Sequence, residues 1–178
     1  MADRMSAEIW IGGRLRRSLL EQLPVSDLCL DWDDNRLQSV SEANLLAARD
    51  EDGLLHFADA EAAWGEFEEL ENWLRNHKIP FQRHSEGKYE YSPRLVAFRP
   101  DLKGRRNRDL DLLATQTGNP VVEVASIETI IDRMAKLAAN RKQSAVRRLQ
   151  TWEKLFAKLV KVLPPHLPPL PPFEIVDG

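Results

Sequence analysis

The chain has 178 residues, a hydrophobic fraction of 43% and a formal net charge of −3, which exclude a globally disordered chain and suit one medium domain, or one small domain with an appendage. No apolar run approaches the roughly 20 residues that span a bilayer, and the polar N-terminus lacks the features of a signal peptide. Cys29 is the one cysteine, which excludes an intramolecular disulfide. We therefore expect a cytoplasmic protein with no membrane partner.

The charge is distributed unevenly along the chain. Residues 1–100 carry 12 Lys and Arg against 19 Asp and Glu, whereas residues 120–163 carry 9 against 4. This asymmetry indicates an acidic N-terminal region and a basic C-terminal limb that meets a partner, but it does not name that partner.

The first half of the chain predicts short strands and one helix. Residues 8–11 favour a strand because they are β-branched and aromatic, and leucines at helical spacing predict a helix over residues 15–23. Residues 45–48 and 54–60 predict two strands joined by a turn at 50–53, because Asp-Gly offers the positive φ that a tight turn needs.

A second helix and a hairpin follow. The segment 66–78 predicts an amphipathic helix with one apolar stripe. Residues 81–99 predict a hairpin whose turn is Glu86-Gly87, and that turn places Arg83 opposite Glu90 as a favourable pair.

The predicted elements indicate an α+β fold with a small mixed or antiparallel sheet and helices on one of its faces. Their β-α-β-β-α-β order suggests a ferredoxin-like split βαβ arrangement.

The remainder predicts a charged connection, two helices and an extended tail. A short helix is expected at 110–114, a helix capped by Ser126 should run to about residue 139, and another covers 144–163. The apolar stripe changes phase between these last two segments, which favours two helices over one rod. Proline-rich residues 164–172 predict polyproline II. The expected division is 1–100, 101–125, 126–163 and 164–178.

The last helix and the tail carry the first candidate site. The apolar stripe of the helix includes Trp152, Phe156 and Leu159, and we expect Trp152 and Phe156 to be buried, either within the protein or against another chain. In the tail, the apolar residues are Leu167, Leu170 and Phe173, and we expect them to anchor it in a groove of its own molecule or of a constant partner.

A second candidate site is a set of cations in the connection and the last two helices. Rows of cations of this kind suit a phosphate backbone, although they also occur on solvated helix faces or docked on an acidic surface. The residues are Arg105, Arg106, Arg108, Arg141, Lys142, Arg147, Arg148, Lys154 and Lys158.

Other patterns are weaker. His56, Asp59 and Glu61 do not converge if they lie on one strand, so we expect neither a metal nor another cofactor. The predicted hairpin gathers polar and aromatic side chains on one face, for which ordinary strand packing is the better interpretation than base stacking. These are Gln82, His84, Tyr89 and Tyr91.

Three functional hypotheses remain. The first is a non-catalytic interaction or assembly protein that binds a protein partner or a second copy of itself through its C-terminal helices and tail. The alternative is a nucleic-acid-binding accessory protein that uses the basic connection and last helix. An enzyme ranks last because no catalytic motif supports it.

Overall fold

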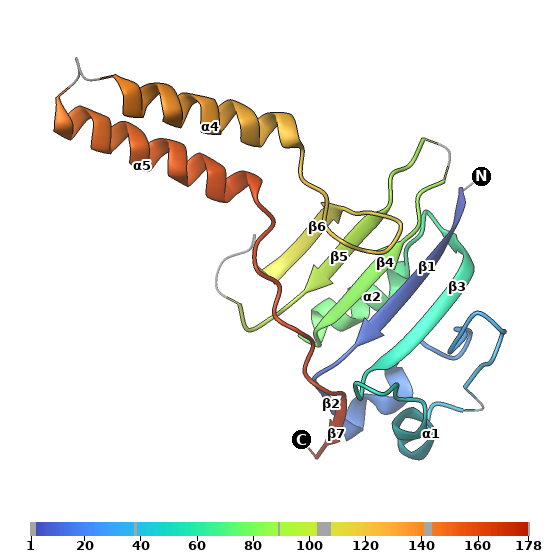
Figure 1. The fold of residues 1–178 in the computed structure, drawn as a ribbon. Coiled ribbons are helices and arrows are strands. Elements are labelled where there is room, and N and C mark those ends of the chain that lie inside the picture. The colour runs from blue at the N-terminus through green and yellow to red at the C-terminus, as the bar shows by residue number, and fades with distance from the viewer. Residues whose placement is uncertain (1–2, 38, 89, 103–107, 141–143, 178) are drawn as a thin grey trace. The chain divides into compact units, whose positions relative to one another are not determined.

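The computed structural model describes residues 3–37, 39–88, 90–102, 108–140 and 144–177. A five-stranded sheet with helices confirms the α+β class (Figure 1). The chain forms two compact units. We call residues 1–119 together with 167–178 the body, and residues 120–166 the hairpin unit.

The sheet of the body is antiparallel throughout, in the order β3-β1-β4-β5-β6. Because β3 and β4 both run antiparallel to the β1 between them, they are parallel to each other. Helix α2, Glu68–Asn76, connects them, so the sheet contains one split β-α-β arrangement. The strands are β1 Arg4–Ile11, β3 Leu55–Ala63, β4 Phe81–Ser85, β5 Arg94–Phe98 and β6 Asp109–Leu113.

Two of the elements expected in the first half of the chain are wrong, and with them the full ferredoxin-like order. The segment expected as a helix at 15–23 is strand β2, Arg14–Arg16, followed by the 3₁₀ helix η1, Arg17–Gln22. The strand expected at 45–48 is helix α1, Glu42–Ala47. Ser41 explains the second difference, because its hydroxyl accepts a hydrogen bond from the Asn44 amide at 3.3 Å and caps the helix.

The register of the β4–β5 pair also differs from the prediction. The last paired residues are Ser85 and Arg94, so the connection is longer than two residues. Arg83 lies opposite Val96 rather than Glu90, and His84 lies opposite Leu95 rather than Tyr89, a residue outside the described ones.

The short helix expected at 110–114 is the edge strand β6. Its acidic and leucine residues alternate, which is the period of a strand, and Leu110 is buried. The guanidinium of Arg94 on the neighbouring strand pairs with the Asp111 carboxylate, with Nε 2.9 Å from Oδ1.

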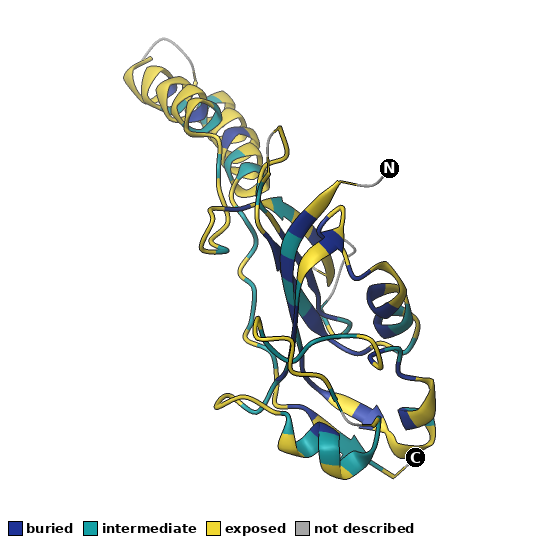
Figure 2. Ribbon diagram, turned by 90° about the vertical axis from the view of Figure 1, so that its right-hand side faces the viewer, coloured by how far each residue is buried: buried dark blue, intermediate teal, exposed yellow. Residues whose placement is uncertain are grey.

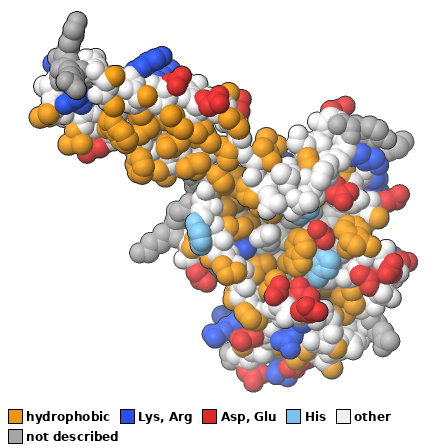
Figure 3. Space-filling view, viewed as in Figure 1, with side chains coloured by type: hydrophobic (Ala, Val, Ile, Leu, Met, Phe, Trp, Pro, Cys, Tyr) orange, Lys and Arg blue, Asp and Glu red, His pale blue; other side chains and the backbone are white. Residues whose placement is uncertain are grey.

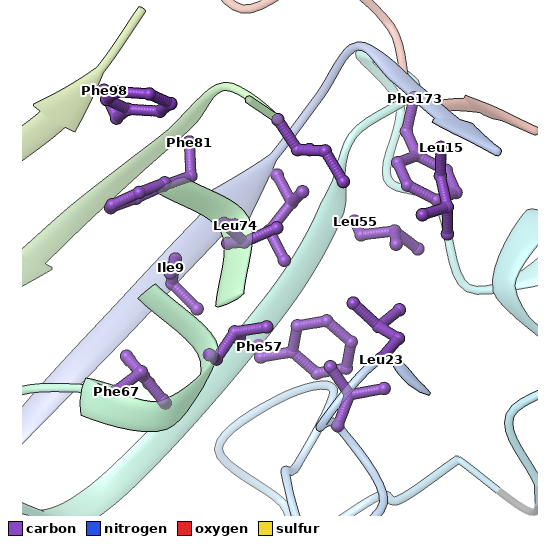
Figure 4. Close-up of a cluster of buried hydrophobic side chains, with 14 of the residues drawn as sticks. Ile9, Leu15, Leu23, Leu55, Phe57, Phe67, Leu74, Phe81, Phe98 and Phe173 are labelled. Carbon is purple, nitrogen blue, oxygen red and sulfur yellow. The ribbon is translucent and has the colours of Figure 1, made fainter. Parts of the chain in front are cut away.

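Part of the core of the body lies between α2 and the sheet (Figure 4). Helix α2 contributes Leu70 and Leu74, which pack in one buried cluster with Phe57 of β3 and Phe81 of β4. The amphipathic helix expected at 66–78 is therefore confirmed, with its apolar stripe turned inward.

A buried ion pair interrupts this apolar layer. The Arg83 and Glu71 side chains are 4% and 6% exposed, and Arg83 Nε lies 2.6 Å from Glu71 Oε1. The Nε–H does not point at that oxygen, so the contact is an ion pair rather than an aligned hydrogen bond. Arg75 adds a second cation, with Nη1 3.2 Å from Glu71 Oε2.

The C-terminal segment returns to the body and completes its core. Phe173 is 1% exposed and belongs to the main buried cluster. The last strand β7, Glu174–Val176, pairs in parallel with β2 (Figure 1). The Phe173 amide donates to Gly53 O at 2.9 Å. This placement agrees with the expectation that the tail covers an apolar groove of its own molecule.

Close backbone contacts hold the proline segment before Phe173. A Cβ atom added to Gly12 would lie 2.1 Å from Pro171 O, so a larger residue there would displace the tail. Arg99 donates from Nε to Pro168 O at 3.1 Å and from Nη1 to Phe81 O at 2.7 Å. Burial lowers the pKa of Arg99 to about 10, so it still carries its charge at neutral pH.

The hairpin unit contains helices α4, Val124–Ala139, and α5, Ala145–Val162, as the change of phase predicts. Ser144 caps α5 by accepting from the Arg147 amide at 3.4 Å. The expected cap of α4 is wrong, because Ser126 lies inside the helix and its hydroxyl donates to Glu123. Buried residues are few in this unit compared with the strands of the body (Figure 2).

We predict that Phe173→Ala lowers the free energy of unfolding by about 3–5 kcal/mol, because it empties a site in the core. Pro169→Ala is the matched control, since Pro169 is exposed in the same segment. Urea denaturation checks both variants. Equal stabilities would show that the tail does not contribute to the core.

We predict that Glu71→Ala costs about 3–5 kcal/mol because it leaves the Arg83 charge buried without its closest partner. Asp111→Ala removes the exposed partner of Arg94 and should cost less than about 1 kcal/mol. The combined change Glu71→Leu and Arg83→Met should recover most of the loss. Denaturant titration of the three variants measures this, and a loss for the double variant as large as for Glu71→Ala contradicts the argument.

Candidate functional site

The hairpin unit carries most of the exposed apolar side chains. Thirteen large hydrophobic residues are exposed in the described part of the chain, and nine of them belong to this unit. The nine are Val121, Val124, Ile131, Val146, Leu149, Trp152, Phe156, Val160 and Leu163.

On α5 these residues form a continuous stripe. Leu149, Trp152, Phe156, Val160 and Leu163 recur at spacings of 3, 4, 4 and 3, which places them on one face of a helix. Trp152 is 42% exposed and Phe156 is 54% exposed, so neither is buried within the described chain, and their burial against another chain stays a prediction.

A different stripe of α5 faces α4. Leu155 is buried, and Leu159 is packed beside it against Ile130 and Leu137 of α4. The apolar pattern of α5 therefore covers two adjacent faces of the helix. Periodicity identified an amphipathic helix but did not show which part of its apolar surface meets α4.

The exposed residues of both helices share one side of the hairpin unit. Ile131 follows the buried Ile130 by one position, just as Phe156 follows the buried Leu155, and Val124 precedes Ile131 by two helical turns. Because the two helices form an antiparallel pair, the same rotation on each brings these residues to the same side. Hydrophobic side chains gather there over α4 and α5 (Figure 3). We call this surface the apolar face; it consists of Val124, Ile131, Leu149, Trp152, Phe156, Val160 and Leu163.

Cations lie on the opposite side of α5. Arg147, Lys154 and Lys158 are exposed, and none of the three forms an ion pair with another described residue. Lys158 also lines a shallow pocket of about 490 Å³ together with Ser126 and Thr129 of α4. We call this surface the basic face.

The other expected cations lie elsewhere or outside the described residues. Arg148 is half-buried on α5. Arg108 belongs to the body, where its backbone carbonyl accepts from the Arg99 amide at 2.7 Å. Arg105, Arg106, Arg141 and Lys142 lie outside the described residues.

The tail residues belong to the body rather than to the hairpin unit. Leu167 and Leu170 are half-buried and Phe173 is in the core. Their apolar surface therefore serves the chain's own packing, whereas Trp152 and Phe156 remain exposed.

One face of the sheet brings two histidines to one carboxylate. Glu8 Oε2 lies 3.3 Å from His56 Nε2, and Glu8 Oε1 lies 3.7 Å from His84 Nδ1. His84 Nε2 lies 3.2 Å from Thr115 O, so Nε2 carries a proton, since a carbonyl can only accept. Trp10 stacks on His56 with ring centroids 5.0 Å apart. Within the described residues, no group of three or more His, Cys, Asp or Glu could hold a metal.

The opposite side of the sheet has a groove that the sequence did not indicate. Two pockets of about 410 and 550 Å³ share Glu66, Arg83 and Asp111 as lining residues. Trp64 and Tyr91 line the larger pocket, and their rings meet edge to face at 5.8 Å. Desolvation and the nearby acidic side chains raise the pKa of Tyr91, so its phenol stays neutral at physiological pH.

Comparison with known proteins does not identify a function for this chain. No family model matches the chain, and comparison with curated proteins and with solved structures gave no match either. None of the described helices is both long and apolar enough to cross a membrane.

Proposed function

We propose that this protein is an assembly protein that associates through the apolar face of its hairpin unit. The observation that carries the proposal is the continuous exposed stripe of α5 that includes Trp152 and Phe156, extended by Ile131 on α4. Monomeric proteins rarely expose apolar patches of this extent, and tryptophan is enriched at the energetic centres of interfaces.

The size of the apolar face suits a stable interface. Its large side chains, each about half exposed, present on the order of 600 Å² of apolar surface, against about 800 Å² that each partner contributes to a standard interface. A partner that covers such a surface should itself offer an apolar face two helices wide.

A second copy of the hairpin unit offers a matching surface. Two hairpin units packed by their apolar faces would form a four-helix bundle with a common core. The small core of one unit supports this pairing, since Ile130, Leu137 and Leu155 are the buried apolar residues among those described in the unit. A core of this size stabilises a helical pair weakly, and association would enlarge it.

We predict that the protein dimerises and that the double change Trp152→Ser with Phe156→Ser makes it monomeric, because the change removes the centre of the apolar face. Trp32→Ser is the matched control, since Trp32 is similarly exposed, at 52%, but lies in the body. Sedimentation velocity over a range of protein concentrations measures both variants. The proposal is contradicted if the unchanged protein stays monomeric and its own chain covers the apolar face.

The basic face supports nucleic-acid binding as a second candidate function. Arg147, Lys154 and Lys158 form an exposed row on the side of α5 away from the apolar stripe. A phosphate backbone could therefore bind there while the apolar face remains free.

If the basic face binds nucleic acid, replacing Arg147, Lys154 and Lys158 by Gln should weaken binding to single- or double-stranded DNA or RNA. The slope of log K against log salt should fall by about 1 for each phosphate that the variant no longer neutralises. Lys78→Gln is the control, because Lys78 is an exposed cation of the body. Fluorescence anisotropy at several salt concentrations gives both quantities. Absence of binding by the parent at low salt rules this candidate out.

A further inference from the structure

The groove beside α2 is the strongest additional site in the described part of the chain. Its floor is the buried Arg83, and its rim comes from α2, from the residues just before that helix and from β6. Apolar contacts are available in the larger pocket from Met5, Trp64, Tyr91 and Leu113.

The groove is acidic once its internal ion pairs are counted. Six carboxylates and three guanidinium groups line it. The cations are already engaged, because Arg83 pairs with Glu71, Arg75 with Glu71 and Asp109, and Arg94 with Asp111. Glu68 and Glu90 have no ion pair among the described residues, and Glu66 has only a long one. Glu66 comes within 3.9 Å of Arg83. An anionic ligand would meet these carboxylates without gaining a free cation, so the groove suits a cation.

An aromatic pair stands beside these carboxylates. Trp64 is 47% exposed, and its backbone has φ +57°, a conformation that a bulky residue seldom adopts. Tyr91 is exposed as well and meets Trp64 edge to face. Ring faces attract ammonium and guanidinium groups, and the alkyl part of such a side chain packs on them. Aromatic rings next to carboxylates therefore fit Lys or Arg.

The groove also borders the edge of the sheet. β6 is the last strand of the described sheet order, so its outer backbone groups have no partner strand there. Asp109, Asp111 and Leu113 alternate along β6 and line the groove. An extended peptide that pairs with β6 would present every second side chain to the groove.

We propose that this groove binds an extended peptide rich in Arg or Lys. One cationic side chain lies against Trp64 and Tyr91, with its charge facing Glu66 and Glu90, and the peptide continues across the groove toward Leu113 at the edge strand β6. The site is in the body and does not depend on the apolar face of the hairpin unit.

Fluorescence anisotropy with a labelled peptide of alternating Arg and Val tests this proposal on the full-length protein. The same peptide with citrulline in place of Arg keeps the shape but removes the charge, and it should bind at least about tenfold more weakly. Equal binding of the two peptides would overturn the cation site.

Two variants test the proposed contacts. Trp64→Gly removes the aromatic wall and should weaken binding about tenfold, while stability holds or rises because glycine accepts a positive φ. Glu66→Gln combined with Glu90→Gln should weaken binding to a similar extent and reduce its salt dependence. The matched controls are Trp32→Gly and Glu51→Gln, exposed residues elsewhere in the body.

The outcomes separate this site from the hairpin unit. The Trp152→Ser and Phe156→Ser variant should bind the peptide as the parent does, even where it has lost self-association. Absence of peptide binding by the parent, or unchanged binding by Trp64→Gly, would overturn the proposal. Peptide binding that fails only in the hairpin variant would place the site on the apolar face and overturn it as well.

Discussion

The return of the C-terminal segment to the core is the constraint on which the rest of the structure depends. Phe173 fills a site among residues from the first third of the chain, and the close approach of Gly12 to Pro171 leaves no room for another side chain. The body therefore cannot complete its core until its last residues have folded back. The hairpin unit is in consequence an insertion within the body, attached to it at both ends. Fixing both ends lowers the conformational entropy that the intervening chain still has to lose.

Buried charge explains why the body has a groove on one side of its sheet. Helix α2 has nine residues, and its leucines pack toward Phe57 and Phe81. Toward β6 the helix instead presents Arg75, which pairs with Asp109 at 3.3 Å. A polar contact of this kind does not need close packing, whereas an apolar one would have closed the space. The Arg83–Glu71 pair supports the same region from within the core, so stability and an open groove coexist there.

The sequence predicted the elements that have strong local signals. Helix α2, strand β3 and the separation of α4 from α5 follow from periodicity and breakers, and the role of Phe173 as an anchor followed from its place in a proline-rich segment. The errors have physical reasons. Helix α1 is favoured by its serine cap and by the burial of Leu45, and β6 gains its stability from pairing with β5. The burial of Glu71 could not be foreseen, since its partner Arg83 comes from a strand that follows the helix.

The two units differ in how far each can stabilise itself. The body buries a large cluster that includes its own C-terminal segment, so its fold is complete within one chain. The hairpin unit buries three apolar residues among those described and leaves a longer apolar stripe exposed. Burial of that stripe by a partner would therefore stabilise the hairpin unit by mass action and leave the stability of the body unchanged. Association and ordering of the hairpin would then be coupled, while the groove of the body remains preformed. A partner on the apolar face would therefore change the stability of the hairpin unit more than that of the body.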